Sequence, residues 1–298
     1  MNRPASPSDD QNPQLIHWLL LAFLSLVWGS SYILIKRGLE VFTPPQLACL
    51  RIVISFLAFL PIFIVRFRKI DWSKFKYLAI VGFSGSFFPS FLFALAQTEL
   101  SSSTTGVLSS LTPLFTLMLG ILLFGLPLVW SKVVGVAIGL SGAVLLILFG
   151  GGDGLSGNPW YGLLVLLGCF LYATSSNTVK VYLQEINTIT LSAAAFVIIG
   201  FPTLPVLFYT DFVSVMQEVE GAWAALGYVS ILALFGTVLA SILFFRLVQL
   251  TNAVFGSMVS YLIPMVALGW GLLDGEFIGW FHFIGMVLIL IGVYISGK

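Results

Sequence analysis

Charge is what this sequence has least of. Only 8% of its 298 residues are Asp, Glu, Lys or Arg, whereas soluble domains carry roughly 25%. Because 59% of the residues are hydrophobic, a soluble core of this size could not bury all the apolar surface, so part of the chain must contact lipid. The net charge of +1 gives no electrostatic basis for binding nucleic acid.

Cysteine is also scarce, and carboxylates are missing from the middle of the apolar runs. Cys49 and Cys169 are the only cysteines. Both lie in apolar runs without metal-ligand spacing, so we interpret them as packing residues and predict neither a metal nor a cofactor. A charge at mid-membrane costs some 2.5–3.5 kcal/mol and is usually functional where it occurs. The absence of such a carboxylate removes the simplest proton relay.

Long apolar runs take up most of the chain. A helix needs about 20 apolar residues to cross a membrane, and these runs are continuous, whereas barrel strands alternate over about ten residues. We therefore predict an all-α, polytopic membrane protein with ten transmembrane helices. The predicted spans are 15–36, 46–66, 75–97, 101–124, 130–149, 159–181, 190–208, 223–245, 251–273 and 280–296.

Lysine and arginine are distributed unevenly between the two sides that these spans define. Ten of them share the side of both termini, against Lys36 and Arg37 on the other. The positive-inside rule then places both termini in the cytoplasm, in a multi-pass protein of the bacterial inner or plasma membrane. Residues 1–14 are expected to be a disordered N-terminus. Arg51 lies within the second span, where it could snorkel outward, form a gate or bind a carboxylate.

The second half of the sequence repeats features of the first. "VWGSSYILIK" at 27–36 aligns with "LYATSSNTVK" at 171–180, and "LSSLTP" at 108–113 aligns with "VSYLIP" at 259–264. Both stretches of the second pair fit S-x-L-x-P, with the proline near the middle of its span. Spans one to five therefore match spans six to ten.

This match predicts two five-helix repeats, 15–149 and 159–298, joined by a link at 150–158. Because five is odd, the second repeat enters the membrane in the opposite sense. Inverted-topology repeats are common in secondary transporters, where the site lies at the repeat interface near the bilayer midplane. The polar clusters of the first and sixth spans are then expected to be walls of one central pocket.

The repeated prolines, Pro113 and Pro264, are predicted to be helix kinks. Proline cannot donate to the carbonyl four residues before it, which frees the carbonyls of Ser109 and Ser260. Unsatisfied carbonyls in lipid cost several kcal/mol, so they should face protein or a wet cavity. The alternative is that the prolines kink the helices for packing only.

Three stretches together resemble a known family: "WGSSYILIK", "TPPQLACLR" and "ALAQTELSSSTTGVLSSLTPLFTLMLG". With the five-plus-five layout, they resemble the ten-helix EamA-type transporters of the drug/metabolite transporter superfamily, over roughly 15–296. The resemblance implies a central cavity lined mainly by spans 1, 3, 4, 6, 8 and 9. It also implies transport of small metabolites, often amino acids and frequently outward. The family's Gly-Glu pair is kept at Gly275-Glu276 but is Gly125-Leu126 after the fourth span.

The expected function is therefore a secondary transporter that works by alternating access and is not an enzyme. The lack of a membrane carboxylate argues against the drug/proton exchange of the superfamily's small multidrug exporters. It favours a neutral or zwitterionic substrate, and the resemblance implies that this is an amino acid or a related compound moved by export. The expected partners are this small molecule and the lipid bilayer, with no nucleic acid, and the chain is taken as a monomer.

Candidate substrate-binding residues come from the repeated polar stretches. Ser25, Trp28 and Tyr32 share one helical face by their spacing, and the aromatic pair Trp28 and Tyr172 suits an apolar body or an amine. Helix packing is the competing interpretation for each residue. The full candidate set is Trp28, Ser31, Tyr32, Gln97, Ser109, Ser110, Tyr172, Ser175, Ser176, Asn177, Ser260 and Tyr261.

Two other classes of function remain open. A channel or a receptor could have the same number of spans. "GFSG" at 82–85 matches the serine motif of intramembrane rhomboid-type proteases, in which Ser84 would be the nucleophile and His282 its base. A protease has no need of an inverted repeat, which favours the transporter.

Overall fold

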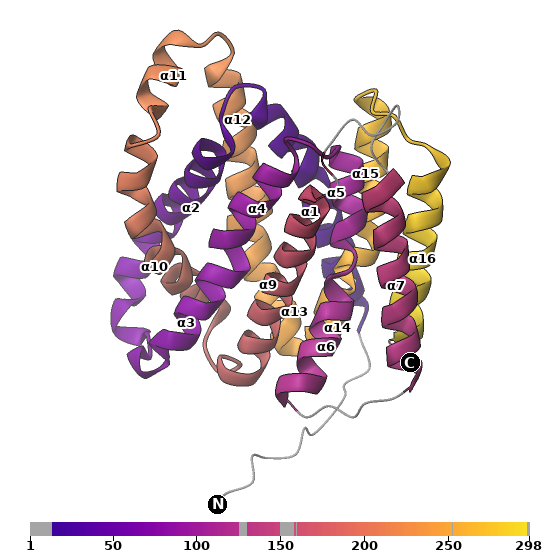
Figure 1. Ribbon diagram of the computed structural model, residues 1–298. Helices are drawn as coiled ribbons and strands as arrows, with labels where there is room; N and C mark the ends of the chain where they lie inside the picture. The colour runs from indigo at the N-terminus through magenta and orange to yellow at the C-terminus, as the bar shows by residue number, and fades with distance from the viewer. Residues whose placement is uncertain (1–13, 125–129, 150–157, 159, 252, 297–298) are drawn as a thin grey trace, which may run out of the picture.

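The structure is a computed structural model, and it describes residues 14–124, 130–149, 158, 160–251 and 253–296. All regular structure in these residues is helical (Figure 1). Eight helical segments are long and apolar enough to cross a membrane, and shorter apolar helices at Val133–Leu146 and Trp280–Gly292 lie within predicted spans five and ten. The all-α membrane fold is thus confirmed. The expected N-terminus 1–14 and link 150–158 lie, apart from one residue each, outside the described residues.

The helices follow the predicted spans in order, although several spans consist of two or more pieces. The first half contains α1 (Leu15–Leu39), α2 (Pro44–Arg66), η1 (Phe67–Lys69), η2 (Trp72–Lys74), α3 (Phe75–Gly82), η3 (Phe83–Phe87), α4 (Phe88–Ala96), α5 (Ser102–Ser109), α6 (Thr112–Phe124) and α7 (Trp130–Phe149). The second half contains α9 (Tyr161–Tyr182), α10 (Thr188–Phe208), α11 (Phe212–Glu218), α12 (Ala222–Ala233), η4 (Leu234–Leu239), α13 (Ala240–Leu250), α14 (Ala253–Ser257), α15 (Val259–Leu273) and α16 (Trp280–Ser296).

Local sequence signals fix where several of these helices begin. Thr43 precedes α2, and its backbone N–H donates to the Gln46 side chain at 2.9 Å in a capping box. Proline is tolerated in the first helical turn because its missing N–H has no partner there anyway. The helix therefore begins at Pro44, two residues before the predicted start at 46. Asn187 caps α10 with its side-chain oxygen, which accepts a hydrogen bond from the backbone N–H of Ile189 at 3.2 Å.

The large contacts between helices cross from one half of the chain to the other. α1 of the first half packs on α15 and α12 of the second, and α9 of the second half packs on α6 and α4 of the first. Further large contacts join α2 to α10, α5 to α15 and α7 to α16. When the halves are exchanged span for span, this set of contacts maps onto itself, as the sequence repeat requires.

Glycine allows the closest of these cross-half contacts, between α7 and α16. A Cβ added to Gly142 would lie 2.8 Å from the carbonyl oxygen of Gly285, and one added to Gly292 would lie 2.5 Å from that of Gly135. Small residues let membrane helices approach backbone to backbone. At a shift of 150 residues Gly135 aligns with Gly285 and Gly142 with Gly292, so these repeat-related glycines lie in one interface.

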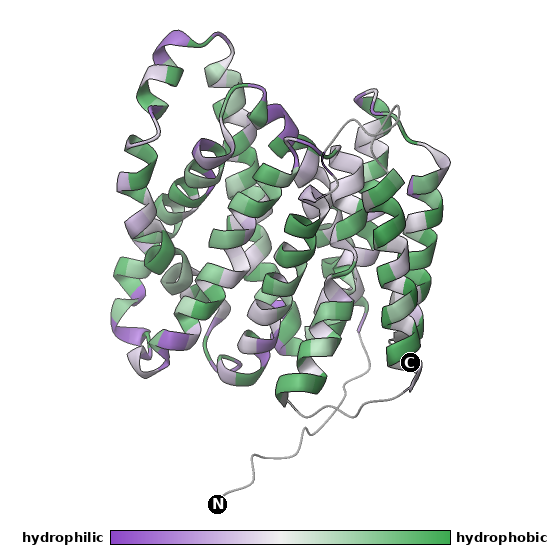
Figure 2. Cartoon of the chain, in the orientation of Figure 1, coloured by the Kyte–Doolittle hydropathy of each residue, from purple (hydrophilic) through white to green (hydrophobic). Residues whose placement is uncertain are grey.

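Hydropathy separates the ends of the bundle from its sides. Hydrophilic residues gather at the two ends of the helices, around α11 at one end and the turn between α2 and α3 at the other (Figure 2). Large apolar side chains are exposed on the outside, including Trp130 and Leu273 at 81% each. Such a surface suits a bilayer, in which water does not compete for apolar contact.

Candidate functional site

Two of the spanning segments contain a π-helical stretch at equivalent positions. η3 connects α3 to α4, η4 connects α12 to α13, and they begin 151 residues apart. A π-helical turn inserts a residue into the regular hydrogen-bond ladder and is frequent at functional sites. Each stretch brings a glycine and a hydroxyl residue to the same cavity: Gly85 and Ser86 from η3, Gly236 and Thr237 from η4.

The helix that contains Pro113 is broken just before the proline. α5 ends at Ser109 and α6 begins at Thr112. The Ser109 carbonyl, which Pro113 cannot bond, accepts a hydrogen bond from the Thr112 hydroxyl at 2.7 Å, and the Cys169 thiol lies 3.7 Å away. In the second half the break falls at Met258, between α14 and α15, and Pro264 lies inside α15.

The two π-helical stretches and the two breaks border a central cavity of about 100 Å³. Both halves of the chain line it. Its walls are Trp28, Ser31, Tyr32, Ile35, Arg51, Gly85, Ser86, Phe93, Ser109, Thr112, Tyr172, Ser175, Ser176, Gly236, Thr237, Ser241, Phe244, Phe245, Gly256, Ser257, Ser260 and Ile263. They come from spans 1, 3, 4, 6, 8 and 9, with Arg51 added from span 2.

Eight of the twelve candidate residues line this cavity: Trp28, Ser31, Tyr32, Ser109, Tyr172, Ser175, Ser176 and Ser260. The other four lie elsewhere. Asn177 donates from Nδ2 to the backbone carbonyls of Thr116 and Ala173, which ties α9 to α6. Ser110 bonds the Val107 carbonyl in its own turn. Gln97 is buried outside the cavity, and Tyr261 is partly buried against the core.

The aromatic walls are two pairs related by the repeat. Trp28 meets Phe244 edge-on at 5.0 Å between ring centroids, and Tyr172 stacks on Phe93 at 5.6 Å. The Trp28 indole also donates to the carbonyl of Gly236 in η4 at 2.9 Å. Sequence reasoning missed both phenylalanines. The shift of 151 residues that aligns the fourth span with the ninth also aligns Phe93 with Phe244, and this alignment would have identified both phenylalanines.

Each π-helical glycine faces a serine of the opposite half. A Cβ on Gly236 would lie 2.8 Å from the Ser31 hydroxyl, and a Cβ on Gly85 would lie 2.5 Å from the Ser175 hydroxyl. Larger residues at either glycine would collide with these hydroxyls. Ser31 and Ser175 are equivalent at the 144-residue shift, so the same arrangement occurs twice in the cavity.

Arg51 is the clearest residue that the candidate set missed. It does not snorkel to the surface, since it is 9% exposed and lines the cavity. Its Nε donates to the Thr237 hydroxyl in η4 at 2.8 Å, and the Tyr172 side chain is close by. The second span of the first half therefore supplies a positive charge that the second half, with Ala195 at the aligned position, does not.

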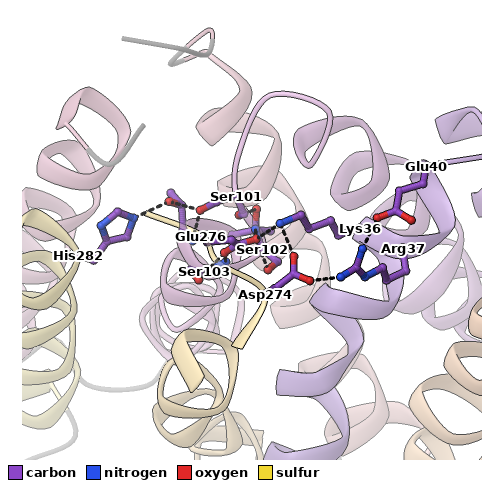
Figure 3. Close-up of polar contacts among 11 residues, drawn as sticks. Lys36, Arg37, Glu40, Ser101, Ser102, Ser103, Asp274, Glu276 and His282 are labelled. Atoms are coloured by element: carbon purple, nitrogen blue, oxygen red, sulfur yellow. Dashed lines mark hydrogen bonds and ion pairs between the residues drawn. The ribbon is translucent and has the colours of Figure 1, made fainter. Parts of the chain in front are cut away.

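A second polar group lies at the end of the bundle where α1 ends, α5 begins and α15 ends (Figure 3). We call it the end cluster: Lys36, Arg37, Ser102, Ser103, Asp274 and Glu276. Lys36 pairs with Asp274 at 2.6 Å and with Glu276 at 2.9 Å, and Arg37 also pairs with Asp274. The cluster joins the first half of the chain to the second.

Glu276 is the centre of this cluster. Its two carboxylate oxygens accept hydrogen bonds from the backbone N–H groups of Ser102 and Ser103 at 3.0 Å, and from both hydroxyls at 2.6 Å. A carboxylate at a helix N-terminus satisfies donors that have no partner within the helix. Burial by itself raises the pKa of Glu276, but these hydrogen bonds and Lys36 outweigh it and lower the pKa from 4.5 to about 2.

At the end of the bundle opposite the end cluster, side chains tie helix ends within the second half. Gln249 donates from Nε2 to the carbonyls of Leu183 and Ile186 at 3.1 and 2.8 Å, and Lys180 donates to the Thr251 carbonyl at 2.5 Å.

The geometry gives no support to a serine nucleophile at Ser84. The Ser84 hydroxyl donates to the Ile80 carbonyl at 2.6 Å. Both ring nitrogens of His282 lie near other groups, with Nε2 3.0 Å from the Thr104 hydroxyl and Nδ1 accepting the Gly279 N–H at 3.2 Å. A nucleophile needs its base within hydrogen-bond reach, and these two residues are not hydrogen-bonded to each other.

Comparison with known proteins decides the family. The model of the EamA-like transporter family matches residues 16–148 and again residues 159–297. The chain belongs to the EamA-like transporter family. The two matched ranges of this EamA-like transporter correspond closely to the two halves of the chain, which make equivalent helix contacts in the fold.

Its relatives carry transporter names. An uncharacterized transporter of Archaeoglobus fulgidus is 26% identical over 93% of this chain and 97% of its own. The uncharacterized inner membrane transporter YedA of Escherichia coli strain K12 is 27% identical over 91% of this chain and 87% of its own. A solved crystal structure matches with a TM-score of 0.63 over 95% of this chain and 97% of that chain. At 16% identity this match shows a shared fold alone.

Proposed function

We propose that this EamA-like transporter is a secondary transporter that moves a small neutral or zwitterionic metabolite out of the cell by alternating access. An amino acid or a related compound fits best. The observation that carries the proposal is the central cavity, to which the two halves contribute equivalent aromatic, glycine and hydroxyl residues. Transporters built from inverted repeats place the substrate at the repeat interface.

The chemistry of the cavity favours this substrate class. The rings of Trp28 and Tyr172 offer flat apolar surfaces that also suit an amine, and several hydroxyls line the same cavity. Among the described residues that line the cavity, none is an Asp or a Glu. A substrate with net positive charge would therefore find no carboxylate to pair with, whereas a neutral or zwitterionic one needs none.

The end cluster supports alternating access. It ties α1 and α5 of the first half to the 274–276 turn of the second by ion pairs and hydrogen bonds. These contacts must break if the cavity is to open between α1, α5 and α15 at this end. Because the two repeats cross the membrane in opposite senses, the equivalent movement of the other repeat would open the cavity at the other end.

Flux measurements on purified protein in proteoliposomes test the proposal. We expect saturable, steeply temperature-dependent uptake of particular amino acids. Flux that rises in proportion to concentration without saturation would instead indicate a channel. Before that experiment, substrates can be found by thermal stabilisation, because a bound ligand raises stability by RT ln(1 + [L]/Kd).

We further propose that the protein is a monomer in the bacterial inner membrane with both termini in the cytoplasm. The relative YedA is named as an inner membrane transporter, and the sequence places ten cations on the side of the termini. A reporter after Leu290 and another at Asp153, in the link outside the described residues, should report opposite compartments. If both report the same compartment, the inverted repeat is wrong.

A further inference from the structure

The cavity has a symmetric frame but an asymmetric distribution of charge. Gly85 and Gly236, Ser86 and Thr237, and Phe93 and Phe244 are repeat partners. Arg51 breaks this symmetry, since its counterpart in the second half is Ala195. The cavity-lining glycine, hydroxyl and aromatic residues are duplicated, but the charge of Arg51 is not. This difference indicates that Arg51 does more than pack the repeat.

Arg51 lies where a charge is costly, and the described chain gives it no carboxylate. It is 9% exposed, and the ion pairs found among the described residues lie within the end cluster or join its Arg37 to Glu40, so none involves Arg51. Its Nε donates to the Thr237 hydroxyl at 2.8 Å and its guanidinium lies near the Tyr172 hydroxyl, and neither of these partners is a carboxylate. A buried guanidinium is stable only when its charge is compensated, and its planar fork fits a carboxylate with two parallel hydrogen bonds. The side chain is therefore suited to an anion that enters the cavity.

Ser175 gives an independent indication of a ligand. It is 3% exposed and lines the same cavity, yet its hydroxyl has no hydrogen-bond partner among the described residues. Its repeat partner Ser31 does have one, the Val27 carbonyl at 3.0 Å. A buried hydroxyl without a partner costs free energy, which a polar ligand in the cavity would recover.

We propose that Arg51, positioned by Thr237, and Ser175 form an anion-binding subsite that holds the carboxylate of the transported molecule. The inference rests on the proposed function and narrows its substrate class to carboxylate-bearing zwitterions. The aromatic walls around Trp28 and Tyr172 then hold the remainder of the molecule. Arg51 is a specificity-determining residue, because a molecule of the same shape without the carboxylate leaves the guanidinium uncompensated.

Matched ligand pairs test the subsite. Purified protein is heated with each neutral amino acid and with the corresponding amide, which has nearly the same shape but lacks the carboxylate and so carries a net positive charge. The amide is therefore interpreted together with Arg51→Gln, which tests binding of the acid at unchanged ligand charge. The wild type should be stabilised by the acid and not by its amide. Arg51→Gln should weaken apparent binding of the acid at least about tenfold, as loss of a charge-assisted hydrogen bond implies. Arg246→Gln removes an exposed arginine from α13 and should leave the acid's effect unchanged.

Further variants separate binding from folding. Without ligand, Arg51→Gln and Ser175→Ala should have unchanged or raised melting temperatures, because each removes a buried group that lacks full compensation. Ser175→Ala should weaken binding of the acid several-fold. If Arg51→Gln does not fold, Arg51→Lys replaces it. That variant should keep the preference for acid over amide at reduced affinity, since the charge remains and the fork is lost.

The outcomes distinguish this inference from the proposed function. Equal stabilisation and equal saturable flux for acid and amide would overturn the subsite and leave the transporter intact. A further experiment titrates chloride in the absence of amino acid and follows the melting temperature. If chloride reproduces the stabilisation and abolishes the difference between acid and amide, the site holds an inorganic anion and the substrate assignment is wrong. Absence of saturable flux for every compound would overturn the proposed function itself.

Discussion

Replacing Glu276 with glutamine should destabilise the protein by breaking the connection between its two halves. The substitution keeps the size of the side chain and removes its charge. Glu276 is the centre of the end cluster, with a side chain that is only 4% exposed. Glutamine retains one oxygen as an acceptor, so one of Ser102 and Ser103 would lose its partner at the start of α5.

The magnitude follows from the pKa of Glu276, which is lowered from 4.5 to about 2. At about 1.4 kcal/mol per pH unit this difference corresponds to ~3 kcal/mol. Lys36 is 35% exposed, so solvent screens part of the interaction, and we expect about 2 kcal/mol. At about 2.1 cal/mol/K of unfolding entropy per residue, that is a fall in melting temperature of roughly 3 °C for a chain of this size.

The pH dependence gives the same prediction a second readout. A carboxyl whose pKa is lowered on folding contributes stability that is fully present above its unfolded pKa. The contribution of Glu276 should therefore be constant above about pH 5 and should be lost as the pH falls from 4.5 toward 2. The glutamine variant cannot titrate, so the two melting curves should converge over this range.

The assay is thermal unfolding of the purified protein in detergent at a series of pH values. Glu218→Gln is the matched control, since Glu218 is exposed on α11 and the substitution changes net charge equally. That control should melt within about 1 °C of the wild type. A melting temperature for Glu276→Gln equal to that of the control, at every pH, would refute the role assigned to the cluster.

Three further predictions concern packing and the cavity. Gly142→Ala should destabilise the protein by about 1–3 kcal/mol, because the added Cβ would lie 2.8 Å from the Gly285 carbonyl oxygen. A Cβ added to Gly269 has nothing within 4 Å, so Gly269→Ala should leave the melting temperature unchanged, and thermal melts compare the two variants. Trp28→Ala or Tyr172→Ala should abolish ligand-induced thermal stabilisation, and if both variants keep it, the cavity is not the binding site. Ser84→Ala should leave saturable flux unchanged, and loss of a proteolytic activity with intact flux would revive the protease interpretation.

The course of the chain through the membrane was predictable because it depends on local properties. Continuous apolar runs determine spans whatever packs against them, and the break before α2 follows from Thr43 and the prolines beside it. The duplication was visible in the sequence at Trp28 and Tyr172. The matching of spans that it implies agrees with the contacts of α1 and α9.

The membership of the cavity could be predicted only in part. Ser175, Ser176 and Asn177 follow one another on α9, yet Asn177 binds the Thr116 carbonyl of α6 while the two serines line the cavity. The rotation of α9 about its axis relative to α6 determines which of these side chains reach the cavity. The hydrophobic periodicity of a single sequence does not define that rotation. Phe93 and Phe244 were missed because a phenylalanine in an apolar run gives no local signal.

The sequence by itself determined the number, order and apolar character of the helices, because these follow from hydrophobic length and from turn residues close in the chain. Only the tertiary structure decided what Arg51 and Glu276 do. Arg51 meets Thr237 across 186 positions, and Glu276 meets Ser102 across 174. A charged side chain near the end of an apolar run can reach the surface or turn inward. Which of the two it does depends on the partner groups that tertiary packing places beside it.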